Sequence, residues 1–182
     1  MYGLLIVSLW VVLPNARQAL RVRPINATGF TAAAGIWIGA YALTLVLHFG
    51  IFVVVPAFPS PLELLSVLRF IGTDMGRLQD ADAATWILAG GRATVLAPLG
   101  EELLFRGALF GWLRQHLSAW PTILLTAIAF AGIHAGVPTV LGLALVIGVG
   151  AGYVRERFGS VTPLVVLHML QNVLLVLATF LL

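Results

Sequence analysis

Three charged side chains interrupt a long apolar run of the sequence, at Glu101, Glu102 and Arg106. Glu102 and Arg106 are four residues apart, so on a helix they share a face and can form an ion pair. Glu101 is rotated about 100° from Glu102 and therefore faces a different neighbour. A carboxylate in such an apolar setting is a candidate general base, the group that takes a proton from water during hydrolysis.

Two other apolar segments carry polar side chains that could join Glu101. His134 ends the sequence F130-A-G-I-H134, and His168 shares a helix face with Asn172 in H168-M-L-Q-N172. Glu101 and His134 each lie roughly 20 Å along a helix from its arginine-bearing end, and His168 lies roughly 10–15 Å from it. We therefore expect three helices to bring one carboxylate, two imidazoles and an amide together. Because polar groups are costly within a membrane, such a cluster indicates a functional site.

The remaining polar residues of the apolar segments have a structural interpretation. His48 stands alone in its segment and His116 lies next to Arg114, and both are expected to be ordinary packed, hydrogen-bonded residues. The pair Glu102–Arg106 is interpreted as a structural ion pair that supports the site rather than performing chemistry.

The composition defines the kind of molecule that must position these groups. Of the 182 residues, 60% are hydrophobic and 9% are charged, and the mean hydropathy is +1.05. Soluble domains have about 25% charged residues, so the sequence predicts an integral membrane protein. The ten basic residues are all arginine and are scattered, which argues against a nucleic-acid partner, and the absence of cysteine excludes disulfides and thiolate chemistry.

The apolar runs predict an all-α transmembrane bundle of about six spans with one amphipathic interfacial helix. Residues 1–182 form one integral membrane domain, in which 1–85 hold the N-terminal spans and the interfacial helix and 86–182 hold the motif-bearing helices. The first run is short for a span, and the glycine-rich run 141–152 is typical of close helix packing. The expected spans are 2–13, 30–58, 86–113, 120–135, 138–154 and 163–182, and the interfacial segment is 59–85.

Arginine placement predicts the orientation of these spans. If the spans alternate in direction, the loop arginines all lie on one side, which the positive-inside rule assigns to the cytoplasm. Both termini then lie outside. The four acids of residues 59–85 then fall on the opposite side. We expect a multi-pass protein of a bacterial inner membrane, and the sequence leaves its oligomeric state open. The six loop arginines are Arg17, Arg21, Arg23, Arg114, Arg155 and Arg157.

The order and context of the three motifs resemble a known family. E101-E102-x-x-x-R106, F130-x-x-x-H134 and H168-x-x-x-N172 are similar to the motifs of the CPBP family of intramembrane proteases, the CAAX prenyl endopeptidase and bacteriocin-processing group, also called Abi or Rce1-like. The resemblance covers about residues 86–182. It implies an intramembrane endopeptidase in which Glu101 activates water. By the same resemblance the other catalytic residues are His134, His168 and Asn172, and the supporting residues are Glu102, Arg106 and Phe130.

The resemblance leaves the cofactor open between none and Zn²⁺. Glu101, His134 and His168 are plausible Zn²⁺ ligands with an open position for water. Asn172 is a poor zinc ligand, however, and the H-E-x-x-H motif is absent. The residues therefore favour slightly a metal-free, glutamate-type protease.

The expected partners are membrane lipid and a protein or peptide whose C-terminal region is hydrophobic or modified. A prenylated CAAX tail, a bacteriocin leader and a C-terminal sorting signal are all compatible substrates. A non-catalytic member of the same family, acting as a bacteriocin-immunity or membrane scaffold protein, is the alternative function. An ion transporter with buried carboxylates is a third.

Overall fold

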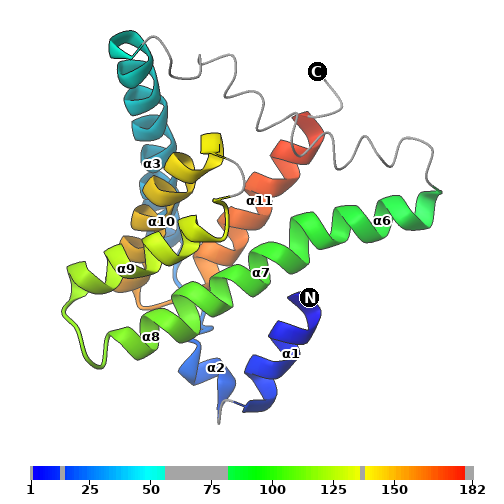
Figure 1. The fold of residues 1–182 in the computed structure, drawn as a ribbon. Helices are drawn as coiled ribbons and strands as arrows, with labels where there is room; N and C mark the ends of the chain where they lie inside the picture. The colour runs from blue at the N-terminus through cyan, green and yellow to red at the C-terminus, as the bar shows by residue number, and fades with distance from the viewer. Residues whose placement is uncertain (1, 13–14, 56–81, 136–137, 179–182) are drawn as a thin grey trace.

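A computed structural model describes residues 2–12, 15–55, 82–135 and 138–178, and over these residues the chain is helical with no strand (Figure 1). Each predicted span from residue 86 onward coincides with a helix. Most of the expected interfacial segment 59–85 lies outside the described residues. The all-α prediction is therefore confirmed for the described part of the chain, whereas the number of membrane spans stays a prediction.

The motif Glu101-Glu102 lies in the middle of one long helical rod over residues 83–113. Its successive parts are α6 (Ala83–Gly91), η1 (Arg92–Leu96), α7 (Ala97–Glu102), η2 (Leu103–Leu109) and α8 (Phe110–Leu113), where η denotes a π-helical turn. The rod crosses the whole molecule (Figure 1). π turns are rare and are frequently found at functional sites, and here one lies on each side of α7.

The start of this rod is capped by a side chain. Asp82 precedes α6 and accepts a hydrogen bond from the backbone N–H of Thr85 at 2.7 Å. This bond from the Thr85 backbone lowers the pKa of Asp82. The carboxylate also favours the positive end of the helix dipole, so Asp82 fixes the residue at which the rod begins.

Helices α9 (Ala119–Gly132) and α10 (Pro138–Phe158) pack closely because their interface is made of small residues. A methyl group built on Gly148 would lie 3.0 Å from Cα of Ala127, and one built on Gly152 would lie 3.1 Å from a side-chain carbon of Ile123. Small residues let helix backbones approach closely in lipid. The packing interpretation of the glycine-rich run 141–152 is thus confirmed.

The opposite face of α10 packs on α3 (Ala27–Val54) and α11 (Thr162–Ala178). These three helices share a buried core of seven apolar side chains. Since α11 also lies against α7 and η1, it connects this core to the motif rod. The core residues are Ala33, Trp37, Ile147, Ala151, Val154, Leu164 and Leu167.

The N-terminal helix α1 (Tyr2–Val12) packs against α7, and the segment of α2 (Ala16–Ala19) packs against the following part of the rod, around Leu103. The eleven residues of α1 extend about 16 Å, which is about half of the hydrocarbon thickness. As described, α1 is therefore too short to cross a bilayer on its own, which refines the expectation of a span over residues 2–13.

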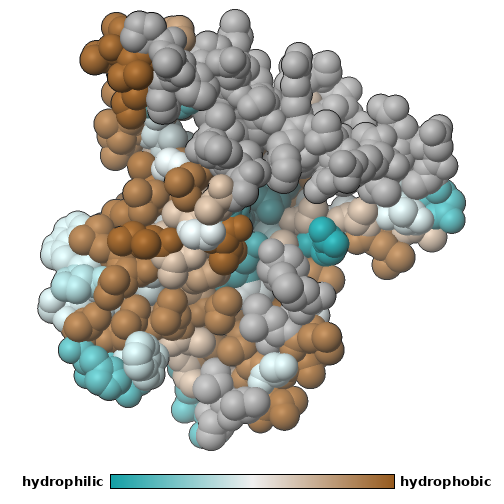
Figure 2. All heavy atoms as spheres, viewed as in Figure 1, coloured by the Kyte–Doolittle hydropathy of each residue, from teal (hydrophilic) through white to brown (hydrophobic). Residues whose placement is uncertain are grey.

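The outer surface of the bundle is apolar over much of the face seen in Figure 2. On α3, Ile38, Val46 and Val53 are each more than 60% exposed. Among the described helices, α3 alone is long and apolar enough to cross a membrane by length and composition, whereas α9 and α11 are apolar but shorter. A helix that exposes this much apolar surface is suited to contact with lipid.

Candidate active site

Glu102 and Arg106 form the predicted ion pair at the centre of the rod. Nη1 of Arg106 donates to Oε1 of Glu102 at 3.1 Å, and both side chains are fully buried. Glu102 is the last residue of α7 and Arg106 lies in η2, so the rod supplies both partners. The prediction that Glu102 and Arg106 form an ion pair is confirmed.

His168 of α11 binds the same glutamate. Its Nδ1 lies 2.9 Å from Oε1 of Glu102. An ionised carboxylate only accepts hydrogen bonds, so Nδ1 carries the proton and donates it. Oε1 of Glu102 thus receives one donor from its own rod and one from α11, and these two bonds hold the imidazole ring in a defined orientation.

The second nitrogen of His168 faces Glu101. Its Nε2 lies 3.9 Å from Oε2 of Glu101, and the Glu101 side chain is 8% exposed. Glu101 and Glu102 therefore face opposite edges of one imidazole ring. If the ring is neutral, with its proton on Nδ1, then Nε2 and Oε2 are both hydrogen-bond acceptors. At this separation one water molecule could donate a hydrogen bond to each of them.

Phe130 of α9 lies at the junction of the site. Its ring centroid lies 4.3 Å from Cζ of Arg106, 4.8 Å from the ring of His134 and 6.1 Å from the ring of His168. Phe105 packs edge-on against it at 5.5 Å. The aromatic face stabilises the guanidinium by a cation–π interaction, and the ring brings both histidines of the motif set to one place.

His134 is close to the cluster but is bonded to its own helix. It follows the C-terminal end of α9, is half-buried, and places Nδ1 2.9 Å from the carbonyl oxygen of Phe130. A carbonyl oxygen only accepts hydrogen bonds, so Nδ1 donates there. The other nitrogen, Nε2, is the one left for a ligand or substrate.

Asn172 is engaged farther along the rod. Its Nδ2 donates to the carbonyl oxygen of Ala93 at 2.9 Å. Ala93 lies in η1, eight residues before Glu101, or about 12 Å along a helix. The described hydrogen bond of Asn172 thus joins α11 to the π turn rather than to the carboxylates, and the second N–H of its amide remains available.

Two residues of the site were not predicted from the sequence. The ring of Trp37 in α3 lies 6.0 Å from the ring of His168 and helps to bury it. Nε of Arg155 donates to the carbonyl oxygen of Arg106 at 2.8 Å, although the sequence placed Arg155 in a loop. Neither residue lies in a recognisable motif, so no sequence signal pointed to them.

The two histidines interpreted as structural lie elsewhere on the chain. Nδ1 of His116 bonds to the carbonyl oxygen of Trp112 at 3.0 Å at the exposed end of the rod. His48 is buried in α3. Neither contacts the glutamates in the described contacts, in agreement with the sequence interpretation.

The predicted zinc ligands can be compared with the geometry of the described residues. Over the described ranges, no three side chains of His, Cys, Asp or Glu come close enough to hold a metal ion. Of the expected ligand set, Glu101 and His168 face each other. His134 bonds to a backbone carbonyl through Nδ1, which leaves its Nε2 as the nitrogen that could take a ligand.

Comparison with known proteins places this geometry in a family. The family model described as type II CAAX prenyl endopeptidase Rce1-like matches residues 83–174. This range begins at the first residue of α6 and ends two residues after Asn172, so it contains every site residue named above except Trp37. No curated protein and no solved structure matched the chain.

Proposed function

The chain belongs to the Rce1-like family of type II CAAX prenyl endopeptidases, which are membrane-embedded proteases, and from this premise we propose that it hydrolyses a peptide bond with water activated by Glu101. The observation that carries the proposal is the position of His168, whose two ring nitrogens face Glu102 and Glu101. A protease that uses water as its nucleophile needs a base next to that water. Glu101, at the Nε2 edge of the His168 ring, is placed to be that base.

Glu101 is the proposed general base. A water molecule about 2.8 Å from both Oε2 of Glu101 and Nε2 of His168 would donate one hydrogen bond to each. When Glu101 takes a proton, the water oxygen attacks the carbonyl carbon of the substrate peptide and forms a tetrahedral intermediate. Glu101 then returns the proton to the amide nitrogen as the C–N bond breaks, so the carboxyl product keeps the hydroxyl group and the amine product takes the proton.

Glu102 and Arg106 act through His168 in this proposal. The carboxylate of Glu102 fixes the proton on Nδ1 and the angle of the ring, and the charge of Arg106 keeps that carboxylate ionised in an apolar interior. They are positioning residues, because the hydrogen bonds of Glu102 go to His168 and to Arg106.

His134 and Asn172 are the proposed stabilisers of the oxyanion. The free N–H of Asn172 can donate as it stands. His134 donates from Nε2 only as an imidazolium, because its Nδ1 proton is directed at Phe130. A substrate carbonyl that binds between them would receive donors from His134 and Asn172, while Glu101 and His168 hold the water.

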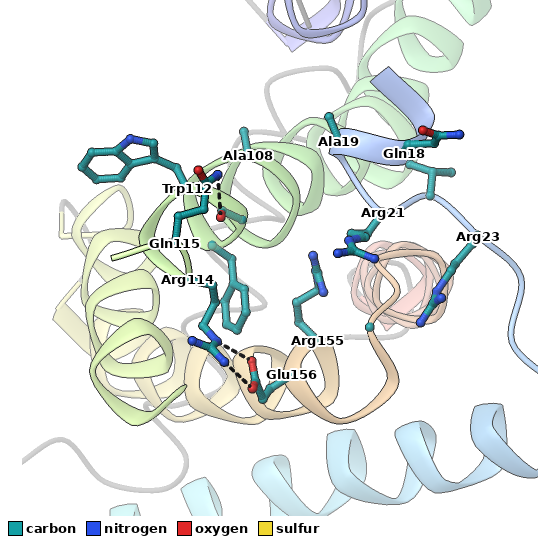
Figure 3. Close-up of a pocket in the computed structure, with 14 residues that line it drawn as sticks. Gln18, Ala19, Arg21, Arg23, Ala108, Trp112, Arg114, Gln115, Arg155 and Glu156 are labelled. Carbon is teal, nitrogen blue, oxygen red and sulfur yellow. Dashed lines mark hydrogen bonds and ion pairs between the residues drawn. The ribbon is translucent and has the colours of Figure 1, made fainter. Parts of the chain in front are cut away.

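The proposed substrate is a protein or peptide whose scissile bond lies near a hydrophobic or modified C-terminal tail. Such a tail can enter from lipid, and the exposed apolar surface of α3 and α9 is compatible with lateral access. We further propose a multi-pass orientation in a bacterial inner membrane with the loop arginines on the cytoplasmic side. In support, Arg21, Arg23, Arg114 and Arg155 surround one cavity at one end of the molecule (Figure 3).

Replacing Glu101 with Gln removes the base and keeps the shape of the side chain. We expect cleavage to fall at least about 100-fold, the scale of general-base catalysis, while the protein stays folded. The measurement is the set of C-terminal peptides of membrane proteins from cells that carry either the original chain or the variant.

Glu156→Gln is the matched control for this experiment, because it removes a carboxylate outside the site and should leave cleavage intact. Unchanged processing in the Glu101→Gln cells would instead favour the non-catalytic immunity or scaffold function.

A chelator separates the metal-free mechanism from the zinc alternative. We expect the purified chain to keep its peptidase activity in the presence of a strong chelator of divalent metals, because the described side chains do not form a three-ligand site. Loss of activity that is restored by added Zn²⁺ would contradict the metal-free mechanism and leave the family assignment unaffected.

A further inference from the structure

A cavity of about 1210 Å³ is lined by several arginines and by neither Glu101 nor Glu102. Three segments line it: residues 18–23 near α2, the end of the rod around α8, and the C-terminal end of α10 (Figure 3). Its charged lining residues are four arginines and one glutamate, which gives a net charge of +3. They are Arg21, Arg23, Arg114, Arg155 and Glu156.

The single acid of this lining is already paired. Nε and Nη2 of Arg114 donate to the two carboxylate oxygens of Glu156 at 2.9 and 3.1 Å (Figure 3). The described residues contain no carboxylate within ion-pair distance of the other three arginines. Three positive charges therefore remain around the cavity after Glu156 has been used.

Arg155 is the buried member of this group. It is 7% exposed, and its Nε is directed to the carbonyl oxygen of Arg106. The guanidinium also lies 5.3 Å from the ring of Phe110. The pKa of Arg155 is lowered to about 10, first by burial and then by the positive charge of Arg21. An anion placed between arginines that line one cavity would reduce the repulsion between their positive charges.

We propose that this cavity binds a phosphate-bearing anion, which in the membrane is the headgroup of an anionic phospholipid. The planar guanidinium group of arginine can donate two parallel hydrogen bonds to phosphate oxygens, and its positive charge complements theirs. The position favours a lipid, because Trp112 lines the cavity and is 58% exposed, and tryptophan is typical of the membrane–water interface. Arginines at that level attract the anionic lipids of the cytoplasmic leaflet.

The test compares two lipids on the full-length protein. The chain is purified in detergent, mixed with dioleoyl phosphatidylglycerol or dioleoyl phosphatidylcholine, and the lipid retained is counted by native mass spectrometry. We expect selective retention of phosphatidylglycerol. The variant Arg21→Gln should weaken it about fivefold, the effect of one interfacial arginine. Gln18→Glu, which adds a negative charge to an exposed lining residue, should weaken it as well.

Arg157→Gln is the matched control, because Arg157 is an exposed arginine two residues from Arg155 that does not line the cavity. Retention should be unchanged in this variant. Thermal denaturation of each variant establishes that Arg21→Gln and Gln18→Glu are folded, which their exposed side chains lead us to expect.

A second arm distinguishes the sources of the anion. Displacement of phosphatidylglycerol by millimolar inorganic phosphate supports a site for the phosphate group itself, whereas retention in phosphate supports a site that also needs the lipid chains. Equal retention of the two lipids, or equal weakening by Arg21→Gln and Arg157→Gln, would overturn the proposal. So would displacement by a short peptide with a free C-terminal carboxylate but not by phosphate.

Discussion

Two arginine–glutamate pairs of this chain are built from the same chemical groups in opposite surroundings. Arg106–Glu102 is fully buried, whereas the side chains of Arg114 and Glu156 are 35% and 31% exposed. The exposed pair is the better bonded of the two, since Arg114 contacts both oxygens of Glu156 and also the carbonyl of Leu117. Within the described contacts, the buried pair leaves Oε2 of Glu102 and Nε and Nη2 of Arg106 without hydrogen bonds.

This difference indicates that the buried pair was not arranged for stability. Burying two charges costs several kcal/mol each, and an imperfectly bonded pair does not recover that cost. What the buried pair does achieve is to hold His168, which shares Oε1 of Glu102 with Arg106. The pair Arg114–Glu156 joins the end of the rod to α10, and this structural role is enough to account for it.

The largest expected effect comes from breaking the buried pair on one side. Glu102→Leu leaves the charge of Arg106 in an apolar interior and removes the acceptor of His168. We expect the free energy of unfolding to fall by about 3–5 kcal/mol, measured by denaturation of the purified chain in detergent or bicelles.

The double variant Glu102→Leu/Arg106→Met is the control for this loss. It removes both charges, so most of the stability should return. Cleavage should nevertheless stay reduced at least about 100-fold, because His168 has lost the carboxylate that positions it. Full activity in the stable double variant would show that the pair is structural only.

The smallest expected effect comes from the matched substitution in the exposed pair. Glu156→Leu should lower the free energy of unfolding by less than about 1 kcal/mol. The difference from the original chain should shrink in 1 M salt, where the screening length is about 3 Å. A loss as large as that in Glu102→Leu would mean that burial is not what separates the two pairs.

Spacing along single helices was the part of this molecule that the sequence could predict. The i, i+4 pair Glu102–Arg106 needed only the helical repeat, and the helices from residue 86 onward follow from apolar runs and their charged ends. The meeting of α7 with α11 was also anticipated, because Glu101 and His168 each had to be placed among other polar groups.

Contacts that depend on how helices cross could not be read from the sequence. Spacing alone did not show that His168 would place Nδ1 on Glu102 and Nε2 toward Glu101. It equally missed the contact of Trp37 with His168, since the crossing angle of α3 and α11 depends on how the side chains of the two helices interlock. The burial of Arg155 was missed because its partner is a backbone carbonyl, which has no sequence signature.

The π turns η1 and η2 determine the direction in which the motif faces. Each accommodates an extra residue in the helix, and one residue corresponds to about 100° of rotation. The short segment α7 can therefore be aimed at α11 independently of the ends of the rod, which are fixed by Asp82 and by the bonds of Arg114. The length of the apolar helix sets the depth of Glu101 and Glu102, and the two π turns set the direction in which they point around the helix axis. A one-residue insertion within Arg92–Leu96 or Leu103–Leu109 is thus the change that would rotate Glu101 and Glu102 relative to α11, although every residue of the site is still present.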